Sequence, residues 1–304
     1  MIEVRPRMAD VDAVFDELVE AFEAGDNPAI ESYVTRYPEH RDELLDFWIV
    51  LSSSERLDES VLDRPERDRL SEIERESIRD LLLAASLGPE MLDRASEEDD
   101  QATEIGAELE RIRGVQYTFG GKAPVAFRRI AVYAWIAGVL SEQAGTGVSR
   151  LRVQKVAYLL EHGLALGVFK KHAKYRYGPY DPTLTYRDAE PGCLKAKYLE
   201  KAAEDLLQAG PKLTKAMEYA RRYLREESVA RAFVVYLSSL DEWALETLTT
   251  VHSLVAELGS EADAGAITRA LEADPKWQSK LRRGNFSTGR IQEALRVLAV
   301  LRMK

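Results

Sequence analysis

The sequence predicts a mainly α fold: two helical lobes, of which the C-terminal one holds a minor β element made of short strands near residues 115–119 and 174–177. Two observations predict it. Apolar residues recur at steps of three and four along most of the 304 residues, and helix-start and helix-stop signals punctuate that pattern. Hydrophobic residues make up 45% of the chain, enough to build real cores.

The first hundred residues predict an acidic helical domain. Apolar positions from Val11 to Phe22 indicate a helix over about 10–24, and Asn27 followed by Pro28 starts a second one that reaches Arg36. Tyr37 and Pro38 break that helix, and a third runs from about residue 39 to 51. A further helix is expected from Leu70, ending before the Gly-Pro pair at 88–89.

Residues 96–100, SEEDD, are the most linker-like part of the chain because they are charged and lack apolar anchors. We therefore predict a helical domain over 1–96, a linker or helix over 97–114, and a mostly helical domain over 115–304. Alternating Val115, Tyr117 and Phe119 predict the first short strand of that second domain.

The second lobe opens with an apolar helix over about 125–143, whose low polarity implies burial on most sides. Ser149 is the expected cap of the next helix, which carries Val153, Val156, Leu160 and Leu164 on one face. Helices are then expected near 194–208, 212–226 and 228–237. Another is expected to open at Ser239 with a capping-box spacing to Glu242.

The stretch YRYGPYDPTL, residues 175–184, interrupts the helical pattern. Residues 174–177 alternate charged and aromatic side chains, which predicts a strand that ends at Gly178. Pro179 fixes the next backbone angle, and Asp181 before Pro182 has the form of a helix start. We expect a strand, a tight turn and a helix entry, suited to a structural corner or to a contact surface.

Several function classes find no support in the composition. The longest apolar run, near residues 130–140, is about half the length of a membrane span, and the N-terminus lacks a signal-peptide pattern. We therefore expect a cytoplasmic protein that makes no use of a membrane. The single cysteine, Cys193, and four scattered histidines show no metal-ligand spacing, so we expect neither a metal nor a cofactor.

Charge divides unevenly along the chain. Residues 1–100 sum to −18 and residues 101–304 sum to +8. The acidic part could dock on the basic part, repel nucleic acid from it, or bind a separate basic protein, and a solvated acidic face is the simplest alternative.

Two separated motifs resemble the Panacea domain, which is found in SocA-like bacterial antitoxins. In that family a helix of the form Leu-Gln-Lys-x-x-Tyr precedes Tyr-Gly-Pro-x-x-Pro, and both the order and the spacing fit over residues 125–260. The matching residues are Val153, Gln154, Lys155, Tyr158, Tyr177, Gly178, Pro179 and Pro182.

The resemblance implies a non-catalytic protein that neutralises a protein toxin, often encoded beside it, by direct binding, with phage defence as the setting. It implies that the motif residues form the scaffold of the domain. Tyr175 and Tyr180 are the candidate partner contacts, and the acidic first lobe suits a basic surface on the partner.

A DNA-binding regulator is the alternative. Residues 264–298 read as three helices with a short polar break, a pattern of the helix-turn-helix type. The candidate nucleic-acid contacts are Lys280, Arg282, Arg283 and Arg290. An enzyme is not expected, because nothing in the sequence pairs a nucleophile with a base or forms a glycine-rich phosphate loop.

Overall fold

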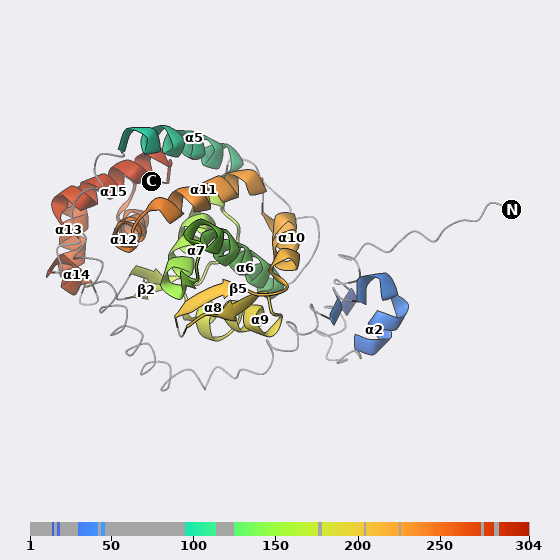
Figure 1. Ribbon diagram of the computed structural model, residues 1–304. Helices are drawn as coiled ribbons and strands as arrows, with labels where there is room; N and C mark the ends of the chain where they lie inside the picture. The colour runs from blue at the N-terminus through green and yellow to red at the C-terminus, as the bar shows by residue number, and fades with distance from the viewer. Residues whose placement is uncertain are drawn as a thin grey trace.

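The computed structural model describes residues 14, 17–18, 30–41, 44–45, 95–113, 125–175, 178–203, 205–224, 226–274, 277–282 and 286–303. This part of the chain is mainly helical with short antiparallel strands, which confirms the predicted fold class (Figure 1). The predicted strand at 115–119 and the predicted helix after Leu70 lie outside the described residues.

The elements follow one another in this order: α2 (Ile30–Arg36), the 3₁₀ helix η1 (Pro38–His40), α5 (Ala95–Arg113), α6 (Val125–Ala144), β1 (Val148–Ser149), α7 (Arg150–Leu164), β2 (Ala173–Tyr175), β3 (Gly178–Tyr180), α8 (Pro182–Tyr186), α9 (Ala189–Lys195), β4 (Leu199–Lys201), β5 (Leu206–Ala209), α10 (Leu213–Tyr223), α11 (Glu227–Ser239), α12 (Glu242–Leu258), α13 (Ala264–Ala273), α14 (Gln278–Arg282) and α15 (Thr288–Val300).

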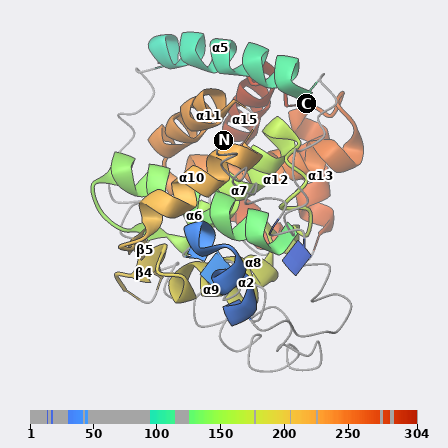
Figure 2. The ribbon, with the colours of Figure 1, turned by 90° about the vertical axis from the view of Figure 1, so that its right-hand side faces the viewer.

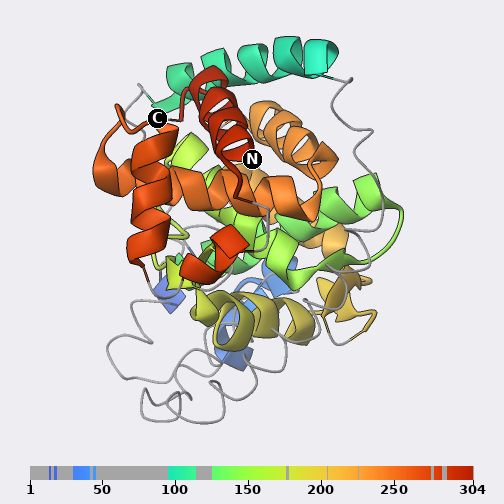
Figure 3. The same cartoon turned by 90° about the vertical axis from the view of Figure 1, so that its left-hand side faces the viewer.

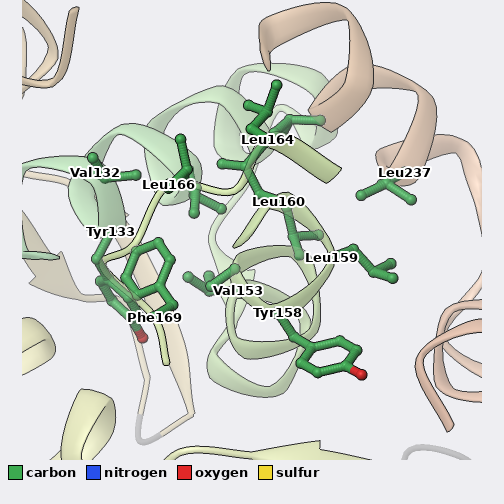
Figure 4. Packing of buried hydrophobic residues seen from close by; sticks show 14 of the residues in the cluster. Val132, Tyr133, Val153, Tyr158, Leu159, Leu160, Leu164, Leu166, Phe169 and Leu237 are labelled. Carbon is green, nitrogen blue, oxygen red and sulfur yellow. The ribbon is translucent and has the colours of Figure 1, made fainter. Parts of the chain in front are cut away.

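The centre of the C-terminal lobe is formed by α6 and α7, with α9, α10, α11 and α12 packed around them (Figure 1). Helix α6 is buried continuously from Phe127 to Leu140 except at Arg128, as its apolar sequence predicts. Figure 4 shows Leu159 of α7 beside Leu237 of α11, and Phe169 beside Tyr133 of α6. Helices α6 and α7 therefore form the core against which the later helices pack.

Helix α5 crosses the top of this lobe over α11 and α15 in the views of Figures 1, 2 and 3. Its buried side chains, Ala102, Ile105, Leu109 and Ile112, follow steps of three and four along one face. Gly106 lies so close to the carbonyl of Val300 that a Cβ atom there would overlap it. The helix is thus packed against the lobe at backbone distance.

Two local signals placed helix ends correctly. Ser149 caps α7 by accepting a hydrogen bond from the Arg152 N–H at 3.1 Å, and Ser287 caps α15 in the same way through the Arg290 N–H at 3.4 Å.

The predicted helix near 194–208 is wrong. Helix α9 ends at Lys195, and the chain then forms strands β4 and β5 of an antiparallel sheet with the order β1-β5-β4. Val148 of β1 pairs with Leu207 of β5, and Leu199 pairs with Ala209. Pairing with β1 outweighs the helical preference of this Lys-, Ala- and Leu-rich segment, because tertiary contacts override propensity.

The proposed capping box at Ser239 is also wrong. Ser239 belongs to α11, and its hydroxyl donates to the Tyr236 carbonyl at 2.8 Å. Asp241 caps α12 instead, accepting from the Ala244 N–H at 2.6 Å. A carboxylate two residues further along thus takes the role expected of the serine.

Candidate functional site

The two motifs meet at the side chain of Gln154, which is fully buried on α7. Its Nε2 donates to the Asp181 carbonyl and to the Thr185 hydroxyl, each at 2.9 Å. Its Oε1 accepts from the Asp181 N–H at 3.3 Å. The amide uses both donors and an acceptor, so it fastens the end of the β2–β3 hairpin to the middle of α7.

The second strand of the hairpin, β3, leads directly into the capped helix α8. Gly178 to Tyr180 pair with residues 173–175 as β3, so Gly178 opens a second strand and the expected tight turn at this glycine is wrong. Asp181 caps α8, as predicted, by accepting from the Thr183 N–H at 2.9 Å, with Pro182 in the first turn. The tyrosine-rich stretch is therefore half hairpin and half helix entry.

Arg129, Asp181 and Asp188 form a buried ion triad beside this cap. Arg129 of α6 donates to Asp181 Oδ2 at 2.7 Å and to Asp188 Oδ2 at 2.5 Å, and also to the Thr183 hydroxyl at 3.0 Å. Burial raises the pKa of Asp188, and the guanidinium of Arg129 opposes that rise. One arginine thus pairs with two carboxylates and joins α6, the hairpin end and α9.

Lys155 and Gly178 meet on the other side of the hairpin. Gly178 has φ of +101°, a conformation that side chains rarely adopt. A Cβ atom there would lie 2.9 Å from the Thr250 hydroxyl and 3.4 Å from Lys155 Nζ. Burial lowers the pKa of Lys155, and the nearby Glu246 partly restores it. The glycine of the motif is required by both its backbone angle and its neighbours.

Tyr158 lies in a cluster of three histidines. Its hydroxyl forms a hydrogen bond of 2.8 Å with His252 Nδ1, and its ring contacts His162 and His172, with centroids 4.5 and 5.3 Å away. Burial is the main cause that lowers the pKa of His252 to about 3, and it also lowers the pKa of His162 and His172. These imidazoles are neutral near pH 7 and serve as packing and hydrogen-bonding groups.

The candidate contact residues Tyr175 and Tyr180 lie side by side on the two hairpin strands, with ring centroids 5.3 Å apart. Both are half-buried. The Tyr180 hydroxyl donates to the Thr185 hydroxyl at 3.0 Å, so Tyr180 also supports the corner. Tyr177 lies outside the described residues, and Pro179 is buried. Of these tyrosines, Tyr175 is therefore the stronger candidate for contact with a partner protein.

The C-terminal helices close over the hairpin, which the sequence did not predict. Trp277 is fully buried, and its Nε1 donates to the Tyr175 carbonyl. Lys174 Nζ lies 5.1 Å from the centre of the Trp277 ring and 2.6 Å from a carboxylate oxygen of Glu257. The hairpin is therefore held by Gln154 of α7 and by Trp277.

Lys280 was predicted to contact nucleic acid, and that prediction is wrong. Its side chain is 1% exposed and forms an ion pair with the buried Glu246. The ammonium also lies 3.4 Å from the Thr250 hydroxyl and 4.9 Å from the centre of the Phe286 ring. A lysine that neutralises a buried carboxylate is unavailable to a phosphate.

The other predicted basic contacts do not form a cluster with it. Arg290 is exposed in the first turn of α15, Arg282 is the last residue of α14, and Arg283 lies outside the described residues. Helix α15 turns Ile291, Leu295 and Leu298 toward the core.

The single cysteine is withdrawn from solvent. Cys193 is fully buried with its Sγ 3.4 Å from the Ile130 carbonyl, and burial raises its thiol pKa well above the ordinary value. Across the described ranges, no group of three or more His, Cys, Asp or Glu side chains is placed to hold a metal ion. Within the same ranges, no helix is long and apolar enough to cross a membrane.

Sequence reasoning missed Arg129 and Trp277. Arg129 lies within the apolar helix expected over about 125–143, and a charge that lies on a helix buried on most sides must have a buried partner. For Trp277 the sequence held no comparable signal, because its contact with the hairpin spans about a hundred residues.

Comparison with protein-family models, with curated proteins and with solved structures finds no match.

Proposed function

We propose that the protein is antitoxin-like: it is non-catalytic and neutralises a partner toxin by direct binding, in a bacterial toxin-antitoxin or phage-defence system. The observation that carries the proposal is the fastening of the Tyr-rich hairpin to α7 through Gln154. It supports the resemblance to the Panacea domain, because the residues that carry the two motifs share one structural unit.

A preorganised hairpin suits binding. Gln154 and Arg129 hold Asp181 at the end of the hairpin, and Trp277 holds the Tyr175 carbonyl, so that little conformational freedom is lost when a partner docks on it. Tyr175 and Tyr180 add a half-exposed aromatic pair. Tyrosine is enriched among residues that dominate binding energy in protein interfaces.

We do not propose DNA binding. Lys280 is buried in an ion pair with Glu246, and of the three candidate arginines only the described side chain of Arg290 is exposed.

Co-expression tests the proposal. The neighbouring reading frame is expressed in a bacterial host with and without this protein, and growth is measured. We expect the neighbour to arrest growth alone and to be neutralised by the full chain, with which it co-purifies. A neighbour that is harmless alone, or one that still arrests growth in the presence of this protein, contradicts the proposal.

A substitution locates the contact. Tyr175→Ser removes a half-exposed ring but keeps the backbone carbonyl that Trp277 binds, so we expect a normal thermal melt and an affinity for the toxin that falls about tenfold or more. Leu206→Ser is the matched control, because it removes an exposed apolar side chain from β5, outside the hairpin. Equal affinity of the two variants would exclude Tyr175 from the interface.

A further inference from the structure

The loop between α7 and β2, residues 165–172, ends in a histidine that is bonded back onto the loop. His172 Nδ1 lies 2.9 Å from the Phe169 carbonyl, and because a carbonyl only accepts, Nδ1 carries the proton. The neutral ring then has its acceptor at Nε2, and this atom is buried without a hydrogen-bond partner among the described residues. Ala173, the next residue, is the first of β2. A movement of His172 is therefore passed directly to the hairpin.

His172 belongs to the histidine cluster, which also contains His162 of α7 and His252 of α12. The rings of His162 and His252 lie 4.8 Å apart, and all three rings contact that of Tyr158, with centroids 4.5 to 5.4 Å away. In the described part of the chain, the hydrogen-bond partners of these rings are the Tyr158 hydroxyl and the Phe169 carbonyl. Neither is a carboxylate, so an added proton would leave a buried cation without a hydrogen-bonded anion.

The charged groups that face the cluster come from four parts of the fold: Glu161 of α7, Asp181 at the cap of α8, Glu257 of α12 and Arg113 of α5. Glu161 and Asp181 favour a proton on His172. Both are already engaged, Glu161 by three backbone N–H groups of the loop and Asp181 by Arg129. Burial is the largest effect on each of the three rings, and it lowers the pKa of each. The closed structure therefore disfavours a charged cluster.

We propose that the histidine cluster is an acid-sensitive switch for the hairpin: when the cluster takes up a proton, residues 165–172 open to water and release the start of β2, while α6 and α7 stay packed. In the open loop His172 is solvated as a cation. The far end of β2 stays attached, because Trp277 donates to the Tyr175 carbonyl. The inference needs no partner and is independent of the toxin-binding proposal.

Acid favours the open loop because an exposed imidazole binds a proton more tightly than this buried one. The pKa of an exposed histidine is about 6.5, and burial lowers that of His172 in the closed structure. Well above pH 6.5 neither form binds the proton, and the closed loop keeps its full stability. As the pH falls below about 6.5 the open form gains, by up to about tenfold per pH unit for each histidine that becomes exposed.

Hydrogen exchange on the full chain tests the switch. The protection of each amide, which is its exchange rate relative to the intrinsic rate at the same pH, is measured at about pH 7.5 and at about pH 5.5. We expect the amides of residues 167–172 to lose about tenfold in protection at the lower pH, and those of residues 130–140 in α6 to keep theirs. Equal loss in both segments would show global acid unfolding and overturn the switch, as would a loop whose protection is the same at both pH values.

Two substitutions assign the effect to the cluster. His172→Gln keeps a side-chain donor for the Phe169 carbonyl but does not titrate, so we expect the loss of protection on acidification to shrink from about tenfold to about threefold or less. His40→Gln is the matched control, because His40 lies in η1, outside the cluster, and it should keep the pH dependence of the wild type.

The same pH dependence in His172→Gln as in His40→Gln would overturn the role of the cluster. If the loop of His172→Gln is already open at the higher pH, His162→Gln replaces it in the comparison, and the same two outcomes decide.

Discussion

Gln154 holds both backbone groups of Asp181: its amide nitrogen donates to the Asp181 carbonyl at 2.9 Å, and its amide oxygen accepts from the Asp181 N–H at 3.3 Å. The side-chain amide thus binds the backbone of Asp181 in the way that a neighbouring strand would. Because the pairing takes place in the core, its removal would leave the Asp181 N–H buried without this acceptor, while the Asp181 carbonyl keeps its hydrogen bond from the Leu184 N–H.

Gln154→Leu keeps the volume of the side chain and removes its polar atoms. We expect a loss of about 1–3 kcal/mol in the free energy of unfolding, because the Asp181 N–H loses its partner in the core, whereas the Asp181 carbonyl still accepts from the Leu184 N–H. Urea denaturation measures the change. The same substitution at the exposed Gln208 on β5 is the control and should alter stability by less than about 0.5 kcal/mol. Similar values for both variants would contradict the role of Gln154.

Arg129→Met leaves Asp181 and Asp188 buried without their cation. We expect a loss of about 3–5 kcal/mol at neutral pH. Burial already raises the pKa of Asp188, and removal of the guanidinium raises it further. The protonated acid needs no cation, so the deficit of the variant should shrink as the pH falls. A deficit that is constant between pH 7 and pH 4.5 would argue against the ion triad.

Glu161→Gln weakens the anchor of the loop after α7. The Glu161 carboxylate accepts from the backbone N–H groups of Gly167, Val168 and Phe169 at 2.8 to 3.0 Å. Hydrogen bonds to a charged acceptor are stronger than neutral ones, and we expect a loss of about 1–3 kcal/mol. Faster amide exchange should appear first at residues 167–169. Exchange that rises evenly along the chain would show that the anchor is not local.

The histidine cluster makes stability depend on pH. The folded-state pKa of His252 is lowered to about 3, below that of the unfolded chain near 6.5. The unfolded state therefore binds the proton first, so stability falls as the pH drops below about 6.5 and continues to fall toward 3. His162 and His172 shift in the same direction.

The groups that face the cluster are Tyr158, Glu161, Arg113 and Glu257. For His252 alone the loss between pH 7 and pH 4.5 should be about 2–3 kcal/mol. His252→Asn removes the titrating ring and should flatten the fall in melting temperature over that range. An identical slope in the wild type and the variant would assign the acid sensitivity to other groups.

Two glycine substitutions are expected to act in opposite directions. Gly106→Ala places a methyl group against the carbonyl of Val300, so α5 must shift from the lobe, and we expect a loss of about 1–3 kcal/mol. Gly289→Ala meets nothing within 4 Å and should gain about 0.5–1 kcal/mol from helix propensity in α15. Thermal unfolding compares them, and a Gly106→Ala variant as stable as the wild type would contradict the close packing of α5 against Val300.

The sequence by itself determined the elements whose signals are local. Ser149 and Asp181 each place an acceptor where a helix begins, and the apolar run of α6 implies a buried helix, because capping and periodicity depend only on residues a few positions apart. The resemblance to a known pair of motifs had singled out residues of α7 and of the hairpin, and in the structure Gln154 binds the residue that follows this hairpin.

Only the tertiary structure decided the rest. Residues 206–209 became a strand because β1 offered them a pairing edge, and residues 199–201 pair with that strand, against their own helical preference. Lys280 became the partner of Glu246 and was lost as a surface cation, and Trp277 closed over Tyr175. These outcomes depend on contacts between segments far apart in the chain, and burial, which sets their energy, arises only when those segments pack.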